Sequence, residues 1–376
     1  MTSTDTLVTS GSPIALRGLV KHYGTTRALD DVSLDIPAGS FTAILGPSGS
    51  GKTTLLNALG GFVSLDSGVI EVSGVDMAGV EPSKRGFGYV FQQYALFPHM
   101  TIAENIAFPL VSRKMNKAEI KKRVGRMLEM VELSHVADRA VNQLSGGQQQ
   151  RIALARALVY EPDVLLLDEP LAALDRRLRE TLRAELRQIH DRVGSTFVLV
   201  THDQEEAMSM ADQIVVMRDG RVEQVGTPAE VYDTPATEFV ATFLGDCNLL
   251  AGTVDSTGDL MGERGLMLAR GTGLAPGTPG VATVRPESLR IVRGAPEPNE
   301  AVVRAIVDSQ QFMGREVLIE CTTELGRLQA RVPRSRANAH AEEETRPGCT
   351  IQLGWTVEDV HVISTASSPA KQKAEA

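Results

Sequence analysis

The strongest chemical pattern in the sequence is a glycine-rich segment that ends in lysine and threonine, Gly46-Pro47-Ser48-Gly49-Ser50-Gly51-Lys52-Thr53. Its glycines allow successive backbone N–H groups to face phosphate oxygens, and a helix that starts here adds the positive end of its dipole. Lys52 can reach the β- and γ-phosphates of a nucleotide, while the Thr53 hydroxyl can ligate Mg²⁺. The segment therefore predicts a P-loop that binds a nucleoside triphosphate and its metal ion.

The residues on either side supply the strand and the helix that such a loop needs. The apolar run Phe41–Leu45 predicts a buried strand before the loop, and the run Thr54–Leu59 predicts the first turns of a helix after it. A glycine-rich turn without a ligand is the alternative, but it leaves this order of strand, loop and helix unexplained. We count Thr54, which follows the pattern directly, among the expected nucleotide-binding residues.

Two acidic residues stand at the end of another apolar run, Val164–Leu167. A strand that delivers Asp168 and Glu169 next to a P-loop is typical of a Walker B site, in which Asp168 holds Mg²⁺ and Glu169 polarises the attacking water. Both acids could instead only cap the strand end, and the pair alone does not decide between these interpretations. The P-loop upstream favours the catalytic one.

A second candidate phosphate site lies well downstream of the first, at Leu144-Ser145-Gly146-Gly147-Gln148. Ser145 is a natural N-cap for the helix-patterned residues that follow, and the two glycines open backbone N–H groups to an anion. A lone Ser-Gly-Gly is usually only a turn. One nucleotide already fills the first site, so the simplest arrangement is a dimer in which this segment of each chain meets the nucleotide bound by the other.

Together these motifs resemble the ATP-binding subunits of ABC transporters over residues 14–245. In that family the P-loop is the Walker A loop, Leu144–Gln148 is the signature motif, and Glu169 is the catalytic base. The resemblance assigns four further roles: adenine stacking to Tyr23, sensing of Mg²⁺ and the attacking water to Gln92, the D-loop aspartate to Asp175, and the γ-phosphate contact to His202. It also implies a head-to-tail homodimer with two molecules of ATP at the interface.

Each of these four residues also has an ordinary structural explanation. Tyr23 could simply pack at a strand end, Gln92 could be a polar loop residue, and His202 could be a core histidine with satisfied hydrogen bonds. The motifs around them favour the functional roles. The D-loop, Leu171–Asp175, has alanine where the family often has serine, which puts a hydroxyl contact across the dimer in doubt.

Composition and periodicity indicate the architecture. A chain of 376 residues with 42% hydrophobic residues is long enough for two or three domains. Alternating apolar strands and helices predict an α/β domain over residues 14–245, with a helical subdomain near residues 93–158. Short β-rich runs between turns predict a small β-barrel or sandwich over residues 246–364. Residues 1–13 and 365–376 are expected to be a disordered leader and tail.

Charge, cysteines and hydropathy exclude several classes of protein. The net charge of -9 argues against a nucleic-acid binder. Three widely spaced cysteines form no metal-ligand pattern and no disulfide framework, which fits a reducing cytoplasm. No apolar stretch approaches the ~20 residues that span a bilayer. Any role at a membrane is therefore expected to depend on partner subunits.

The C-terminal region refines the resemblance. Its segment Val284–Leu289 looks like a recurrent motif of the OB-like accessory domain, of TOBE type, in importer subunits for polyamines, iron(III), sulfate, phosphonates, sugars or osmolytes. The run Phe91–Met100 is most similar to the polyamine (spermidine/putrescine), iron(III) and phosphonate branch. The implied partners are two membrane-spanning permease subunits and, indirectly, an extracytoplasmic solute-binding protein. The chain would then act at the cytoplasmic face of the inner membrane. The apolar stretch Tyr94–Met100 could be partly buried core, but its position just after Gln92 favours a docking site for a short permease helix.

Two rival functions stay open from the sequence. A soluble ABC ATPase of translation or DNA repair usually has two cassettes in one chain or a long coiled coil, whereas this sequence has one P-loop, one signature motif and no sustained heptads. A regulatory module would instead sense a ligand through its β-rich end. The presence of both Glu169 and His202 argues against a pure binding role.

Overall fold

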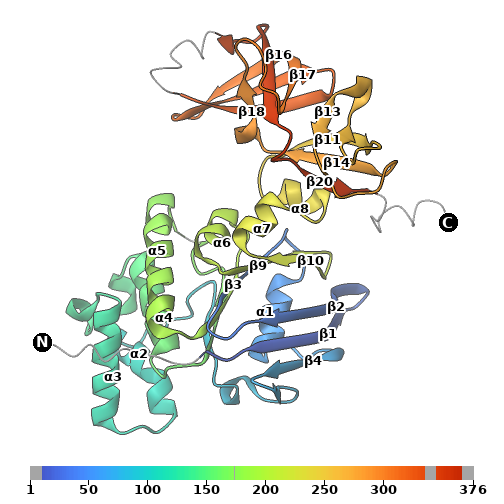
Figure 1. Cartoon of the computed structure of the whole chain (residues 1–376). Helices are drawn as coiled ribbons and strands as arrows, with labels where there is room; N and C mark the ends of the chain where they lie inside the picture. Colours follow the sequence, from blue (N-terminus) through green and yellow to red (C-terminus); the bar gives the residue numbers. More distant parts are fainter. Residues whose placement is uncertain (1–10, 173, 335–343, 366–376) are drawn as a thin grey trace, which may run out of the picture. The chain divides into compact units, whose positions relative to one another are not determined.

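The computed structural model describes residues 11–172, 174–334 and 344–365. The chain divides into two units, residues 1–228 and 229–376 (Figure 1). The first unit combines sheets with helices, and the second is mostly β-structure. This agrees with the predicted architecture, a mixed α/β domain followed by a β-rich domain.

A mostly parallel six-stranded sheet, in the order β10-β9-β3-β8-β7-β6, organises the first unit. Only β10 is antiparallel to its neighbour. Because the carboxyl ends of parallel strands meet at one edge, the P-loop, the two acids and His202 all emerge at the same edge. The strands are β3 (Phe41–Leu45), β6 (Gly88–Val90), β7 (Val164–Asp168), β8 (Thr196–Val200), β9 (Gln213–Arg218) and β10 (Arg221–Gly226).

A second, antiparallel sheet in the order β2-β1-β4-β5 shares a core with the first. The helix α1 (Lys52–Gly60) packs between the two sheets, since one apolar cluster joins Leu55 and Leu59 to Leu16 of β1 and Val198 of β8. This packing fixes the start of α1, and with it the end of the P-loop. The strands are β1 (Ile14–Tyr23), β2 (Thr26–Ile36), β4 (Ser67–Val72) and β5 (Val75–Asp76).

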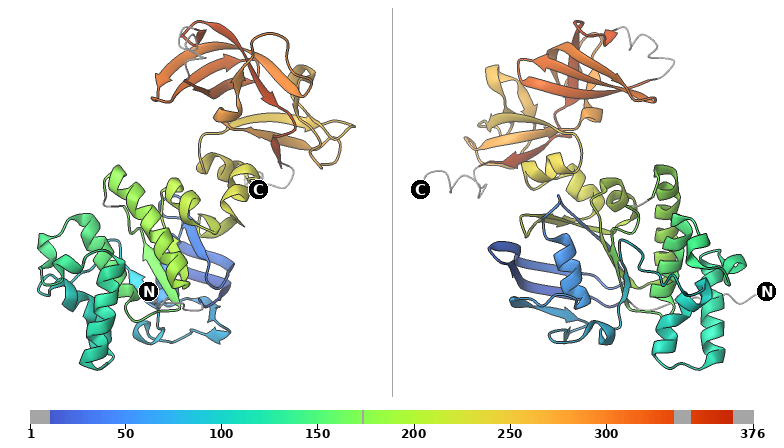
Figure 2. Two further views of the ribbon diagram at one scale, coloured as in Figure 1. Left: turned by 60° about the vertical axis from the view of Figure 1, so that its left-hand side comes forward. Right: turned by 180° about the vertical axis from the view of Figure 1, so that it is seen from behind.

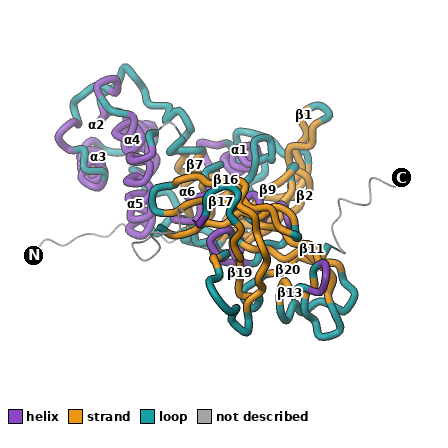
Figure 3. Tube along the Cα trace, turned by 90° about the horizontal axis from the view of Figure 1, so that it is seen from above, coloured by secondary structure: helices purple, strands orange, loops and turns teal. Residues whose placement is uncertain are grey.

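Three helices form a group of their own, α2 (Ile102–Ser112), α3 (Lys117–Met130) and α4 (Gly146–Leu158). They lie on the side of the central sheet opposite to the antiparallel sheet (Figures 1 and 3) and gather at one end of the unit (Figure 2). A capping box between Thr101 and Glu104 starts α2. Two further helices, α5 (Arg176–Val193) and α6 (Gln204–Met210), follow the strands β7 and β8.

The second unit consists of two short helices and two five-stranded sheets around one apolar core. Trp355 is buried in this core, and its indole N–H donates to the Leu268 carbonyl oxygen at 3.0 Å. The helices are α7 (Pro228–Asp233) and α8 (Glu238–Phe243), and one sheet contains β11 (Asn248–Val254), β12 (Leu260–Met261), β13 (Met267–Ala269), β14 (Pro279–Val284) and β20 (His361–Ser364). The other contains β15 (Arg290–Ile291), β16 (Glu300–Phe312), β17 (Glu316–Thr323), β18 (Gly326–Pro333) and β19 (Thr350–Thr356).

The helices α7 and α8 group with the β-rich unit, although sequence analysis places residues 229–245 in the ATPase domain. Arg285 gives the physical reason. Its buried guanidinium donates to the carbonyl oxygens of Tyr232 (2.9 Å) and Ala241 (2.8 Å), and it lies 4.0 Å from the centre of the Tyr232 ring. One side chain of the Val284–Leu289 motif thus fastens both helices to the end of β14.

The expected leader and tail lie mostly outside the described residues. Residues 1–10 and 366–376 are not described, but Gly11 and Ser12 are bonded to the β8 side of the sheet: the Gly11 N–H donates to the Gly194 carbonyl oxygen (3.1 Å), and Thr196 Oγ1 donates to the Ser12 carbonyl oxygen (2.7 Å). At the other end, the Thr365 N–H donates to the Pro279 carbonyl oxygen (3.1 Å). Across the described ranges, no helix has the length and apolarity to cross a bilayer.

Candidate active site

The P-loop joins β3 to α1, and two glycines determine its path. Gly51, the N-cap of α1, has φ 99°, and a Cβ atom on it would lie 2.3 Å from the Ala28 carbonyl oxygen. A Cβ atom on Gly46 would lie 2.3 Å from the Met217 carbonyl oxygen. Glycine avoids both the left-handed strain and these collisions. The loop therefore lies directly against neighbouring backbone.

Lys52 and Thr53 begin α1 at the end of this loop. The buried Lys52 ammonium donates to the carbonyl oxygens of Gly46 (2.8 Å) and Pro47 (2.9 Å). Burial lowers the pKa of Lys52, against the attraction of the two acids that end β7. In the described structure no side chain caps the first turn of α1, and Thr53 is exposed. The ammonium, the hydroxyl and the first-turn N–H groups together suit phosphate oxygens.

Asp168 ends β7 and is aligned with Val200 of β8. Burial raises the pKa of Asp168 and the neighbouring Glu169 raises it further, whereas Lys52 lowers it. Asp168 and Lys52 each favour the charged form of the other, so the two groups lie within electrostatic reach. A carboxylate and a hydroxyl are oxygen donors of the kind that Mg²⁺ prefers, so the chemistry of Asp168 and Thr53 fits the expected metal ligands.

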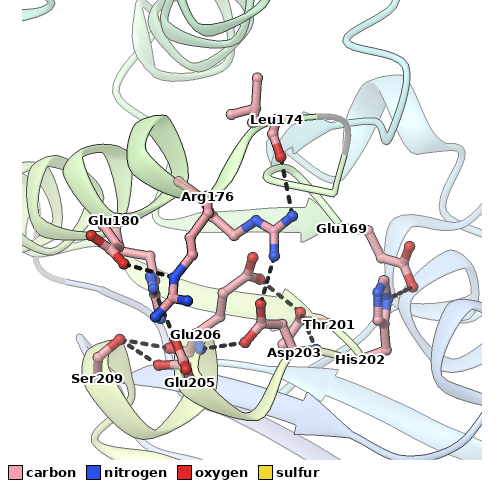
Figure 4. A network of polar contacts seen from close by, with 12 residues as sticks. Glu169, Leu174, Arg176, Glu180, Thr201, His202, Asp203, Glu205, Glu206 and Ser209 are labelled. Carbon is pink, nitrogen blue, oxygen red and sulfur yellow. Dashed lines mark hydrogen bonds and ion pairs between the residues drawn. The ribbon is translucent and has the colours of Figure 1, made fainter. Parts of the chain in front are cut away.

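The side chains of Gln92 and His202 both contact Glu169, the expected catalytic base. Its Oε2 accepts a hydrogen bond from Gln92 Nε2 at 2.9 Å, and its Oε1 lies 3.1 Å from Nδ1 of His202, the pair drawn in Figure 4. Its φ of 42° lies in the left-handed region, and its N–H donates to the Val200 carbonyl oxygen at 2.9 Å. Such backbone strain in a non-glycine residue is concentrated at functional sites. The fold brings Gln92, Glu169 and His202 together from three separate segments.

The Ser145 segment begins α4 with a capping box. The Gln148 N–H donates to Ser145 Oγ (3.4 Å), and the Ser145 N–H donates to Gln148 Oε1 (3.0 Å). A Cβ atom on Gly147 would lie 2.9 Å from the Leu178 side chain, so this glycine also allows α4 to pack closely on α5. Ser145 and Gly146 are exposed. The hydrogen bonds of Ser145 and Gln148 stay within their own turn, away from Glu169.

Asp175 lies at a helix start, whereas Tyr23 lies at a strand end. Asp175 is the N-cap of α5, where its Oδ1 accepts from the Leu178 N–H at 3.0 Å. Tyr23 ends β1 with 50% of its surface exposed, and the Lys21 ammonium lies 5.5 Å from its ring centre. An exposed aromatic face at a strand end is available for stacking.

The apolar stretch after Gln92 contributes to a groove, but not in the way its sequence predicts. Tyr94 is buried, and its carbonyl oxygen accepts from Arg156 Nη2 at 2.8 Å. Phe97 of the predicted stretch lines the groove, together with residues in or next to β6, α2 and α4 that sequence analysis did not select. Its aromatic and basic lining residues are Phe87, Tyr89, Phe91, Phe97, Phe108, Tyr160, Arg113 and Arg156.

A polar network behind His202 was also missed. Thr201 Oγ1 donates to Glu206 Oε2 (2.7 Å) and accepts from the Asp203 N–H (3.0 Å), while Asp203 Oδ1 accepts from the Glu206 N–H (3.1 Å). Glu206 is 2% exposed. An acid three residues after an aspartate is a sequence signal for a helix start, so the N-cap could have been found. The burial of Glu206 has no such local signal.

We expect Glu206→Gln to stabilise the protein at mildly alkaline pH. Burial raises the pKa of Glu206 above its unfolded value, so the wild type loses stability as the pH rises from the unfolded towards the folded pKa, whereas the amide does not titrate. The melting temperature should rise by about 3 °C near pH 8, and this gain should vanish in acid below the ordinary glutamate pKa. Thermal unfolding at both pH values measures the effect, with the exposed Glu205→Gln as the control. A less stable variant at alkaline pH would contradict it.

Comparisons with known proteins cover both units. The model of the family described as ABC transporter matches residues 29–172, and that of the TOBE domain matches residues 282–363. The spermidine/putrescine import ATP-binding protein PotA of Thermobifida fusca is 49% identical over 80% of this chain and 81% of its own length. The sulfate/thiosulfate import ATP-binding protein CysA of Mycobacterium tuberculosis is 46% identical over 91% of this chain and 92% of its own. A solved dimeric ATP-binding cassette in a post-hydrolysis state with ADP and Pi is 36% identical, with a TM-score of 0.52, over 57% of this chain and 98% of its own.

Proposed function

Because this chain belongs to the import ATP-binding proteins of ABC transporters, we propose that it works as a homodimer whose ATP hydrolysis drives uptake of a polyamine or a related small solute. The convergence of Gln92 and His202 on Glu169, beside the P-loop, carries the catalytic part of this proposal. The dimeric state of the solved ATP-binding cassette supports its dimeric part.

ATP would bind across two copies of the chain. Tyr23 would stack on adenine, and the P-loop residues Gly46–Thr54 would surround the phosphates with N–H groups and the Lys52 ammonium. Ser145 and Gly147 of the partner copy would contact the γ-phosphate from the other side. The exposure of Ser145 and its lack of contact with Glu169 in its own chain support this arrangement.

Hydrolysis would depend on the Glu169 carboxylate. It accepts a proton from the attacking water as the oxygen of that water bonds to the γ-phosphorus and the bond to ADP breaks. Gln92 orients the carboxylate through its amide N–H, and His202 contacts the γ-phosphate. Bound Mg²⁺, held by Thr53 and Asp168 and sensed by Gln92, would neutralise phosphate charge. Catalysis is then a matter of position and electrostatics.

The solute is the least determined part of the proposal. The relatives import spermidine and putrescine in one case and sulfate or thiosulfate in the other, by their names. The stretch Phe91–Met100 resembles the branch for polyamines, iron(III) and phosphonates, and within this branch we propose a polyamine first, with iron(III) or 2-aminoethylphosphonate next. Two permease subunits and a solute-binding protein would complete the transporter at the cytoplasmic face of the membrane.

Uptake assays test this choice directly. The chain, with the permease subunits that copurify with it, would be placed in vesicles loaded with ATP. ATP-dependent uptake of radiolabelled putrescine or spermidine supports the polyamine assignment. Uptake of sulfate or iron(III) alone would overturn the solute assignment but keep the importer. ATP hydrolysis without any copurifying membrane subunit would favour the soluble ATPase instead.

The aromatic groove gives a variant that should separate ATP hydrolysis from transport. Phe108 lines the groove from α2 and is 39% exposed, so Phe108→Glu places a charge where an apolar permease helix would dock. Uptake should fall at least about tenfold, as for loss of a central interface contact, while ATP hydrolysis by the isolated subunit stays near the wild-type rate. Val111→Glu is the matched control, because Val111 is on the same helix, 58% exposed, and outside the groove. Equal losses in both variants would contradict a docking role.

A further inference from the structure

Arg179, in the second turn of α5, connects two loops that are far apart in the sequence. Its Nη2 donates to the Leu174 carbonyl oxygen at 3.1 Å, and its Nη1 donates to Asp203 Oδ2 at 3.0 Å. Leu174 directly precedes Asp175, and Asp203 directly follows His202. The dashed lines at Leu174 and Asp203 in Figure 4 mark these two contacts. A single guanidinium thus bridges the Asp175 loop and the His202 loop.

Both ends of this bridge are held firmly. Asp203 caps α6 through its other oxygen, which accepts from the Glu206 N–H at 3.1 Å, so its carboxylate cannot turn away from Arg179 without losing the cap. Leu174 is buried, and its Cδ2 would lie 3.3 Å from a Cβ atom on Gly146, at the start of the Ser145 helix. A shift of this helix start would therefore push on Leu174, whose carbonyl oxygen is bonded to Arg179.

The fork geometry of arginine suits this task. Its planar guanidinium offers several N–H donors in fixed directions, so one side chain can bond a carbonyl and a carboxylate at the same time. Lysine carries the same charge at a single point and does not reproduce the fork. The side chain of Arg179 is 30% exposed and that of Asp203 is 20% exposed. Partial burial reduces solvent screening of the pair compared with the exposed ion pair of Arg176 and Glu180.

We propose that Arg179 is a positioning residue that couples the Asp175 loop to His202 and thereby to Glu169. The inference rests on the proposed roles of Glu169 and His202. In the dimer, contact of the partner copy's nucleotide with the Ser145 segment would be transmitted through Leu174, Arg179 and Asp203 to the side of the site where water attacks. The guanidinium of Arg179 bonds Leu174 and Asp203 and no residue of the P-loop within the described ranges, so we expect its effect in turnover rather than in binding of ATP.

Steady-state ATP hydrolysis by the full chain tests this coupling. Arg179→Ala should lower kcat about tenfold, in line with the cost of small displacements of catalytic groups, with KM for ATP within about twofold of the wild type. Arg179→Lys should recover only part of the loss. Arg176→Ala removes a charge at the start of the same helix and should leave kcat unchanged. Weaker ATP binding, seen as a higher KM, together with an unchanged kcat in Arg179→Ala would overturn the proposal.

A double-mutant cycle separates coupling from general damage to the fold. Asp203→Asn keeps a good N-cap for α6 but removes the charged partner of Arg179. If the two residues act through one contact, the double variant should lose no more kcat than Arg179→Ala alone. If the losses of kcat in the two single variants instead multiply in the double variant, the two residues act independently and the proposal is overturned. An inactive wild-type chain would instead count against the proposed ATPase function, which keeps the two failures distinct.

Discussion

Replacement of Glu169 by glutamine is expected to reduce ATP hydrolysis by about a hundredfold or more while leaving ATP binding intact, because general-base catalysis contributes a factor of this size. The amide is nearly isosteric, so its carbonyl oxygen can still accept from Gln92 Nε2, which bonds Glu169 Oε2 at 2.9 Å. It cannot take a proton from water. The loss should therefore fall on the chemical step alone, and the closed dimer should accumulate with ATP bound.

Two measurements on the purified chain check this result. Nucleotide binding measured by fluorescence should give a similar Kd for the wild type and Glu169→Gln, and light scattering should find ATP-dependent dimer only in the variant. Glu180→Gln, an exposed acid on α5, is the control and should hydrolyse ATP at the wild-type rate. Hydrolysis by Glu169→Gln at the wild-type rate would show that another group is the base.

Local patterns in the sequence were sufficient for most of the ATPase core. The apolar runs predicted at 41–45 and 164–167 correspond to β3 and β7, and Asp219-Gly220, a dipeptide that favours a hairpin turn, joins β9 to β10. The two strands can be predicted because burial on both faces of a strand gives an unbroken apolar run. The turn can be predicted because a tight hairpin turn needs particular residues. The same locality explains why the P-loop was visible as a single continuous motif.

Features that depend on contacts between distant segments could not be read in this way. Tyr94 looks exposed in sequence because it follows a polar loop, yet it is buried, and its carbonyl oxygen is bonded by Arg156 from α4. Arg179 and Asp203 are separated by a helix and a strand, so no spacing rule relates them. The Val284–Leu289 motif could be recognised as a pattern, but only the fold gives its reason, the Arg285 contacts with α7 and α8.

The proposed division of the site between two copies leads to the second large effect, recovery of activity on mixing two inactive variants. Lys52→Ala removes the ammonium from a chain's own P-loop, and Ser145→Arg places a bulky cation where that chain meets its partner's nucleotide. Each homodimer then has the same defect in both of its sites, so each variant alone should be nearly inactive. A mixed dimer has both defects in one site and none in the other.

The size of the recovery follows from this pairing. In an equimolar mixture half of the dimers are mixed, and each has one intact site of two, so the mixture should reach about a quarter of the wild-type rate if the sites act independently. The measurement is the rate of ATP hydrolysis against mixing ratio, with a maximum expected at equal amounts.

Recovery of activity also shows that both variants fold, because only folded chains can complete a shared site. Among the described residues, Ser145 bonds within its own turn, and it lies exposed at the start of α4, so a partner can reach it. A flat response to mixing, or full activity in a chain verified to be monomeric, would mean that one copy holds the whole catalytic site.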